Sequence, residues 1–272
     1  MNTNLVFRGG LGNQMFQYAL LLALRDRGHE VVADISYYNY VKMHNGYELE
    51  HVFGIKDELI NKRGLHLYKL RLLDKWRPSV FYFGDRFSFN EELLCSPRKY
   101  LSGYWQDERY FKSVEDKVRK AFIFRDIDDA NKQIASEMQE RNSISLHLRR
   151  GDYSAFGMAE IGENYYKSAV EEMHSKLNAP YFYVFSDDKD AVKRMMEELG
   201  VAYEVISRNT GKDSFKDMYL MSQCKHNIIA NSSFSWWGAW LNGNKEKIVI
   251  APKVWDENHL YVRPQAEGWS LI

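Results

Sequence analysis

The chain has 272 residues, of which 45% are hydrophobic, and this length can bury the core of one large or two modest domains. Lysine plus arginine and aspartate plus glutamate each number 37, and this balance excludes a general electrostatic attraction to nucleic acid or to an anionic membrane. The two cysteines, Cys95 and Cys224, cannot build a disulfide framework and indicate a reducing compartment. The N-terminus MNTNLVFRGG lacks the basic and apolar segments of a signal peptide, and no apolar run approaches the roughly 20 residues of a membrane span.

The chain opens with a strand, a glycine turn, a helix and a second strand. LVF forms the first strand, RGGLGNQ the turn, MFQYALLLALRDR a helix that ends at Gly28, and EVVADI the second strand. This order predicts a βαβ unit with a parallel strand pair. Gly10 and Gly12 would let the backbone approach a bound group closely, and Asn13 and Gln14 would offer it amide donors and acceptors.

The same turn allows two other interpretations. It resembles the dinucleotide fingerprint G-x-G-x-x-G, with Asp34 as the acid that binds ribose, and would then indicate an NAD(P)-dependent oxidoreductase. Met15 occupies the third glycine position of that fingerprint, so the match is partial. The glycines can also serve only to make a tight turn.

The two halves of the chain differ in regularity. Residues 40–130 mix aromatic and charged side chains without a clear period, and we expect helical excursions there that contact an acceptor substrate. After residue 140, SISLHLR, YFYVFS, AYEVIS, HNIIAN and KIVIAP are predicted strands that alternate with helices. We therefore expect a doubly wound, Rossmann-like sheet and two domains, 1–140 and 141–272, with ligands at the carboxyl ends of strands.

The segment ISLHLRRGDY places charge at the end of a buried strand. A period of two puts His147 and Arg149 on one face, and Arg149 and Arg150 leave the strand at its carboxyl end. The guanidinium fork suits bidentate contact with phosphate. The alternative is an internal ion pair between an arginine and Asp152, with His147 as a core residue.

A second anion site is predicted where HNIIAN ends and SSFSWWGAWL begins. Ser232, Ser233 and Ser235 fall in the first turn of a helix, whose free N–H groups and positive dipole end favour phosphate. The alternative is ordinary N-capping by Asn231 or Ser232, which needs only one of these residues. Phe234 is the candidate contact for a base or ribose.

Two other polar groups allow a metal interpretation. Asp188 and Asp190 form a D-x-D that could hold a divalent ion on a diphosphate, but we favour the N-cap and first turn of the helix that begins near Ala191, where acids are preferred. Cys224 and His226 have no second ligand pair nearby, so we expect no zinc site.

Three segments in this order resemble the α-1,2-fucosyltransferases, in particular the bacterial ones: GGLGNQMFQYA, HLRRGDY, and CKHNIIANSSFSWWGAWLN followed by KIVIAP. The pieces GYELEHVFGI, GYWQDERYF, YFYVFSDD and DMYLMSQC also fall in the expected order, so the resemblance spans nearly the whole chain.

The resemblance implies a GT-B-type fold of two facing Rossmann-like domains, with GDP-β-L-fucose bound by the C-terminal one and no metal or other cofactor. The product would carry fucose in α linkage on O2 of a terminal β-galactoside. The acceptor would be a galactose-terminated oligosaccharide or a lipid-linked glycan. The enzyme would be cytoplasmic, with a peripheral contact at the inner face of the membrane and no nucleic-acid partner.

The resemblance also implies residue roles in the donor site. Arg149 would clamp the diphosphate, Arg150 would support it or fix Asp152, and His147 would contact the nucleoside. Transfer would proceed by one inverting displacement, with Asp152 as the first candidate base and Glu160 and Glu163 behind it.

Ser232, Ser233 and Phe234 would line the donor pocket in this interpretation, and Asn13 would face the junction of diphosphate and acceptor. Arginines read phosphate and not the sugar, so a transferase of another GDP-sugar stays open. A non-catalytic carbohydrate-binding protein is a third alternative, because aromatic side chains alone can stack on sugars.

Overall fold

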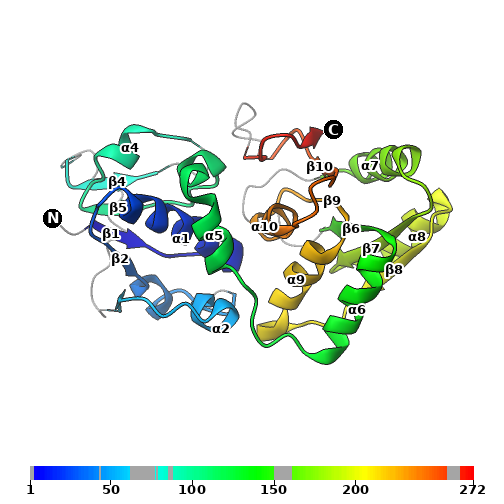
Figure 1. The fold of residues 1–272 in the computed structure, drawn as a ribbon, viewed down its shortest axis with the longest axis horizontal. Coiled ribbons are helices and arrows are strands. Elements are labelled where there is room, and N and C mark those ends of the chain that lie inside the picture. Colours follow the sequence, from blue (N-terminus) through cyan, green and yellow to red (C-terminus); the bar gives the residue numbers. More distant parts are fainter. Residues whose placement is uncertain are drawn as a thin grey trace. The chain divides into compact units, whose positions relative to one another are not determined.

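The computed structural model describes residues 3–42, 44–61, 77, 79–84, 88–149, 161–255 and 264–272. The chain forms two compact units, Met1–Arg125 and Asp126–Ile272, each built around its own parallel β-sheet (Figure 1). The mixed α/β architecture with parallel strand pairs agrees with the prediction from the sequence.

The first unit holds a five-stranded sheet in the order β3-β2-β1-β5-β4. Its strands are β1 (Thr3–Val6), β2 (Val31–Asp34), β3 (Leu59–Ile60), β4 (Phe81–Phe83) and β5 (Tyr100–Ser102). Its helices are α1 (Leu11–Asp26), α2 (Leu49–Phe53), α4 (Glu92–Cys95) and α5 (Glu115–Ala121), with 3-10 turns η1 (Ser36–Asn39), η3 (Glu108–Tyr110) and η4 (Lys112–Val114). All four strand pairs are parallel.

Helix α1 is the longest described helix of this unit and is buried along most of its length. Its apolar side chains occur on nearly every face, and Met15, Ala19 and Leu20 are fully enclosed. Burial of one such side chain contributes about 1.5–3 kcal/mol. The helix ends where predicted, because Gly28 adopts a φ of +83° and donates its N–H to the carbonyl of Arg25.

Residues 40–130 contain short helices, as expected, and also supply β3, β4 and β5 to the sheet, which the sequence did not indicate. These strands have only two or three residues each. A strand of that length is too short to show an alternating pattern, so its place in the sheet depends on pairing with a neighbour: β3 pairs with β2, β5 with β1, and β4 with β5.

The second unit holds a six-stranded sheet in the order β11-β10-β9-β6-β7-β8. Its strands are β6 (Asn142–Leu148), β7 (Pro180–Ser186), β8 (Tyr203–Ile206), β9 (His226–Ile228), β10 (Val249–Ala251) and β11 (Ser270–Leu271). Its helices are α6 (Asp129–Glu140), α7 (Glu163–Lys176), α8 (Lys189–Leu199), α9 (Phe215–Gln223) and α10 (Ser233–Leu241), with the 3-10 turn η6 (Gly211–Asp213). The predicted alternation of strands and helices is confirmed, and β11 adds a strand that the sequence did not indicate.

Helices cover both faces of this sheet, as Figure 1 shows. On one face Ile144, Leu146 and Leu148 of β6 pack with α7 and α8. On the other face Tyr183 and Phe185 of β7 pack with α6 and α9. The alternation predicted for ISLHLR is therefore present, because the leucines point into one helical layer and His147 points away from it.

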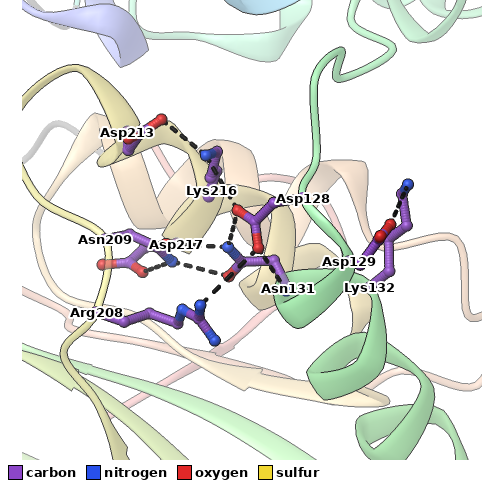
Figure 2. A network of polar contacts seen from close by, with 9 residues as sticks. All are labelled: Asp128, Asp129, Asn131, Lys132, Arg208, Asn209, Asp213, Lys216 and Asp217. Atoms are coloured by element: carbon purple, nitrogen blue, oxygen red, sulfur yellow. Dashed lines mark hydrogen bonds and ion pairs between the residues drawn. The ribbon is translucent and has the colours of Figure 1, made fainter.

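Helix α6 belongs to the second unit, so the division of the chain lies at Arg125–Asp126, before the boundary expected at residue 140. A polar network at the start of α6 explains this placement (Figure 2). Asn131 of α6 and Asn209, in the segment after β8, exchange two amide hydrogen bonds of 3.1 and 3.0 Å. Lys216 of α9 lies 3.1 Å from the carboxylate of Asp128, which caps α6.

Candidate functional site

Each sheet has one point where the order of its strands reverses. In the second unit the chain runs from β6 through β7 to β8 and then returns to place β9 on the other side of β6. In the first unit it runs from β1 through β2 to β3 and later places β5 on the other side of β1. Ligands of open parallel sheets bind at the carboxyl ends of strands at such points. The β6/β9 switch point and the β1/β5 switch point are therefore the candidate sites.

The predicted HLRRGDY and NSSFS segments both start at the β6/β9 switch point. His147 is the second-last residue of β6, and its ring centroid lies 6.2 Å from that of Phe234 in the first turn of α10. Its Nδ1 is buried and has no hydrogen-bond partner among the described residues. Burial and the neighbouring Arg149 lower the pKa of His147 to about 3, so its imidazole is neutral near pH 7.

Arg149 leaves β6 directly after Leu148, and its backbone amide donates a 3.4 Å hydrogen bond to the hydroxyl of Tyr166. Its side chain is partly exposed. Arg150, Asp152 and Glu160 lie outside the described residues. Glu163 is the first residue of α7, and its carboxylate lies 3.2 Å from Lys167.

The serines at the start of α10 divide into two groups. Ser232 is the N-cap, because its hydroxyl accepts from the amide of Phe234 at 3.3 Å, and Ser235 donates to the carbonyl of Ser232 at 3.4 Å. Both side chains are buried, whereas Ser233 and Phe234 are partly exposed. The capping interpretation thus accounts for two serines, and Ser233 and Phe234 are the side chains that a ligand can reach. Asn231 is buried and donates to the carbonyl of Trp255 at 3.1 Å.

The glycine turn lies at the β1/β5 switch point, between β1 and α1. The residue that needs glycine's conformation is Gly9, with a φ of +80°, whereas Gly10 is the extended N-cap and Gly12 lies inside α1. A Cβ on Gly9 would lie 2.6 Å from the side-chain nitrogen of Asn13, and one on Gly10 would lie 3.3 Å from the ring of His44. The close approaches made by Gly9 and Gly10 are therefore to the protein's own side chains.

Of the two amides expected to offer bonds to a ligand, only one remains available. Gln14 is buried, and both ends of its side-chain amide bond to backbone groups. Its nitrogen donates to the carbonyls of Gly9 and Gly46, and its oxygen accepts from the amide of Glu48. Asn13 is partly exposed and accepts a 2.6 Å hydrogen bond from Gln106. Asn13 is thus the amide of the turn that can face a ligand.

Among the described residues, most buried polar atoms without partners lie near the carboxyl ends of strands, above all at the β1/β5 switch point. Such an atom costs about 1–3 kcal/mol and calls for an explanation. Among the described residues of the first unit they are Nε of Arg8, the hydroxyl of Tyr47, Oγ of Ser102, Nε1 of Trp105 and Oε1 of Gln106. All five follow or flank the ends of β1 and β5, and the ring of Tyr47 lies 6.2 Å from that of Phe7.

In the second unit the set contains His147 near the carboxyl end of β6 and Trp255 and Gln265 near the end of β10, with Tyr183 in the middle of β7 as the exception. Gln265 reaches that strand end through a 2.6 Å bond to the carbonyl of Pro252. The concentration of unpaired groups at strand ends is typical of a ligand site, because binding can supply the missing partners. The sequence did not single out Arg8, which precedes the glycines, or Gln106, which lies in the half of the chain without a clear period.

The groups that suggested metals have other contacts. Asp188 caps α8 through a 2.9 Å bond from the amide of Ala191, as expected. His226 accepts from the amide of Ile248 at 3.0 Å, and burial raises the pKa of the Cys224 thiol. Within the described ranges, no three histidine, cysteine, aspartate or glutamate side chains gather as metal ligands.

A cavity of about 800 Å³ opens at the opposite edge of the second sheet, beside the amino ends of β6 and β9. Asn142, Lys225 and His226 are among the residues that line it, and none of the buried unpaired atoms described above does so. Among the described helices, none combines the length and the apolar character that crossing a bilayer requires.

Comparisons with protein families, with individual proteins and with solved structures all match most of the length of this chain. A family model described as glycosyl transferase family 11 matches residues 2–269. An α-1,2-colitosyltransferase of Escherichia coli is 32% identical over 282 residues, which cover 97% of this chain and 96% of that protein. The galactoside α-(1,2)-fucosyltransferase 1 of Rattus norvegicus is 25% identical over 95% of this chain and 68% of that protein. The structure of Arabidopsis thaliana FUT1 in complex with GDP shares the fold, with a TM-score of 0.53 at 12% identity over 92% of this chain and 70% of that one.

Proposed function

The chain belongs to glycosyl transferase family 11, and we propose that it moves L-fucose from GDP-β-L-fucose to O2 of a terminal β-galactoside, giving an α-1,2 linkage. The family makes it a glycosyltransferase, and the finer assignment rests on its relatives and on the chemistry of the switch points. Relatives that resemble it over most of the chain are named for α-1,2 transfer of colitose or of fucose.

The observation that carries the proposal is the meeting of β6 and α10 at one switch point. The ring contact between His147 and Phe234 joins the end of the HLRR strand to the first turn of the NSSFS helix. A guanidinium and a helix N-terminus would then serve the same pyrophosphate. We accordingly place GDP in the second unit of a GT-B-type fold, with His147 and Phe234 beside the nucleoside and Ser233 near phosphate.

The proposed reaction is a single displacement. The acceptor O2 attacks the anomeric carbon, the bond from that carbon to the β-phosphate oxygen breaks, and GDP leaves with the electron pair. Arg149 and the N-terminal amides of α10 would stabilise the charge that develops on the diphosphate, and loss of one such donor lowers the rate by about 10²–10³-fold. We propose Asp152 as the base that takes the acceptor proton, a contribution of about 10²–10⁴-fold. Arg149 and the N-terminal amides of α10 would thus neutralise the diphosphate charge that a metal ion neutralises in other transferases.

The acceptor proposal follows the relatives as well. A galactose-terminated oligosaccharide or lipid-linked glycan is the expected acceptor, and we propose that the enzyme meets it in the cytoplasm or at the inner face of the membrane. The neutral composition of the chain gives a peripheral contact no general electrostatic support.

A comparison of two donors tests the sugar. Colitose is L-fucose without the 3-hydroxyl group, so GDP-β-L-fucose and GDP-L-colitose differ at one position. A site that hydrogen-bonds this hydroxyl rejects the deoxy sugar by about 10⁴–10⁵-fold, whereas an apolar site built for colitose rejects fucose by only about 10²-fold. We expect kcat/KM to favour GDP-fucose by the larger factor and the product to show an α-1,2 linkage by NMR. A preference for GDP-colitose would refute fucose as the sugar, and transfer of neither would refute the proposed reaction.

A further inference from the structure

Asn13 presents a defined amide orientation at the β1/β5 switch point. Its Oδ1 accepts a hydrogen bond of 2.6 Å from Nε2 of Gln106. Among the described residues its Nδ2 has no hydrogen-bond partner, and the side chain is partly exposed. The carbonyl end of the amide is therefore used inside the protein, and the two N–H donors remain for a ligand.

The other end of the Asn13 side chain is fixed by packing. A Cβ on Gly9 would lie 2.6 Å from the Asn13 nitrogen, so the amide rests directly against the glycine backbone. Gly9 holds a φ of +80°, a conformation that other residues rarely adopt. Together Gly9 and Gln106 leave the amide little freedom to rotate.

Gln106 is itself held by a strained and closely packed loop after β5. The preceding residue, Trp105, has a φ of +55°, which is uncommon for a side chain of that size. Its indole is buried against Gly84 and Gly103, where an added Cβ would lie 2.6 and 2.8 Å from the ring. Strain of this kind persists where the surroundings over-determine a conformation, and it occurs often at functional sites.

Gln106 is buried, and its Oε1 has no partner, so among the described residues the bond to Asn13 is the one hydrogen bond of its side chain. A purely structural glutamine would be expected to use both ends, as Gln17 does by bonding both backbone groups of Arg8 and the carbonyl of Gly103.

We infer that Gln106 is a positioning residue: its Nε2–H group holds the carbonyl oxygen of Asn13 and thereby directs the Asn13 N–H donors toward an oxygen of the sugar substrates during transfer. This inference rests on the proposed glycosyl transfer and adds a residue that acts only through Asn13. Because GDP is expected at the β6/β9 switch point, the effect belongs to transfer and not to GDP binding.

Gln106→Glu is the most informative variant. A carboxylate at this position can only accept, so Asn13 must turn its N–H₂ group inward and present its oxygen to the substrate. We expect kcat/KM for transfer to fall about 100-fold and the Kd for GDP, measured by calorimetry, to stay within about twofold. Gln106→Met removes the bond without reversing the amide and should cost about tenfold, which keeps the test available if the buried carboxylate prevents folding.

A double-mutant cycle of Asn13→Ala with Gln106→Met separates positioning from general structural damage, because neither change introduces a charge. If Gln106 acts through Asn13, the double variant should lose no more activity than Asn13→Ala alone. Gln139→Glu is the matched control, because Gln139 is exposed and bonds Gln223 at 2.9 Å in the second unit, and it should transfer at the wild-type rate.

Two results would overturn the inference while the proposed function stands: Gln106→Glu transferring within about twofold of wild type, or losses that multiply in the double variant. The wild-type arm, run with both GDP-sugars, decides the function separately. If it transfers colitose in place of fucose, the same variants are measured with that donor, and the positioning effect is still expected. A wild type that transfers neither sugar removes the proposed function and this inference together.

Discussion

The two switch points are built in different ways from the same topology. At the β6/β9 switch point the polar groups come from short continuous segments, with His147 and Arg149 at the end of one strand and Ser233 and Phe234 just beyond its neighbour. At the β1/β5 switch point they come from segments far apart in the sequence, and the bond from Gln106 to Asn13 spans 93 positions. The first arrangement leaves a motif in the sequence, and the second leaves isolated residues.

This difference suggests a division of chemistry. Arginine and a helix N-terminus suit an anion, whereas the unpaired atoms near β1 and β5 include donors on Arg8 and Trp105 and an acceptor on Gln106. Phosphate oxygens accept only, so a mixed set suits hydroxyl groups of a sugar better. We therefore expect changes at β6/β9 to alter both GDP binding and transfer, and changes at β1/β5 to alter transfer alone.

The largest effect is expected for Arg149→Lys, which keeps the charge and loses the guanidinium fork. Transfer should fall about 10²–10³-fold, and the Kd for GDP should rise, because a bidentate contact becomes a single one. Initial rates with GDP-fucose and calorimetry with GDP measure the two quantities. Arg141→Lys is the control, since that guanidinium lies 4.3 Å from the ring centroid of Tyr181 near the amino ends of the strands. Near-normal transfer by Arg149→Lys would show that the fork is not needed.

A smaller effect, confined to transfer, is expected for Gly9→Ala. The new Cβ would meet the nitrogen of Asn13 and displace its amide, so kcat/KM should fall about 10–100-fold with GDP affinity unchanged. Gly28→Ala introduces the same backbone strain, because Gly28 has a φ of +83°, but no atom lies within 4 Å of its added Cβ. If both variants transfer equally well, displacement of Asn13 has no consequence and the β1/β5 assignment is in error.

The smallest effect concerns the network of Figure 2, which lies outside both switch points and should change stability without changing transfer. Burial raises the pKa of Asp217 to about 7, against an ordinary value of 3.8. Its protonated form is therefore favoured in the folded state, and stability from this group is lost as pH rises from about 4 to about 7. Hydrogen bonds from Asn131 lower the pKa of Asp128. The stability that Asp128 contributes is therefore lost as pH falls and not as it rises.

In the wild type, Asn209 donates a 2.7 Å hydrogen bond to Asp217. The variant Asp217→Asn keeps an acceptor for this bond and removes the buried charge. We expect the melting temperature at pH 8 to exceed that of wild type by about 2–4 °C, the shift that about 1 kcal/mol produces, and the difference to shrink toward pH 5. Thermal melts of both proteins at each pH measure this. A constant difference across that range would mean that Asp217 does not titrate in it.

Much of the second unit was predictable because its strands are long enough to show periodicity and its helices carry recognisable caps. The prediction that Asp188 and Asp190 lie at the start of a helix is confirmed, with Asp188 as the cap. Residue chemistry alone singles out the HLRR and NSSFS segments, whose strands β6 and β9 are neighbours. The oxidoreductase interpretation is displaced by the family of the chain, and Asp34 uses its carboxylate to accept from the amide of Ser36 at 2.9 Å. Which glycine carries the strained φ could not be predicted, since RGGLGNQ allows several turns.

The sequence by itself determined the parallel α/β architecture, the family, and the type of chemistry at the end of β6, because these depend on local periodicity and on residues that are adjacent in the chain. Only the tertiary structure decided that β9 returns beside β6, that Gln106 reaches Asn13, and that Gln14 is consumed by backbone contacts. Pairing between distant segments is set by which surfaces can be buried together, and short strands such as β5 carry no local pattern that reveals their partner.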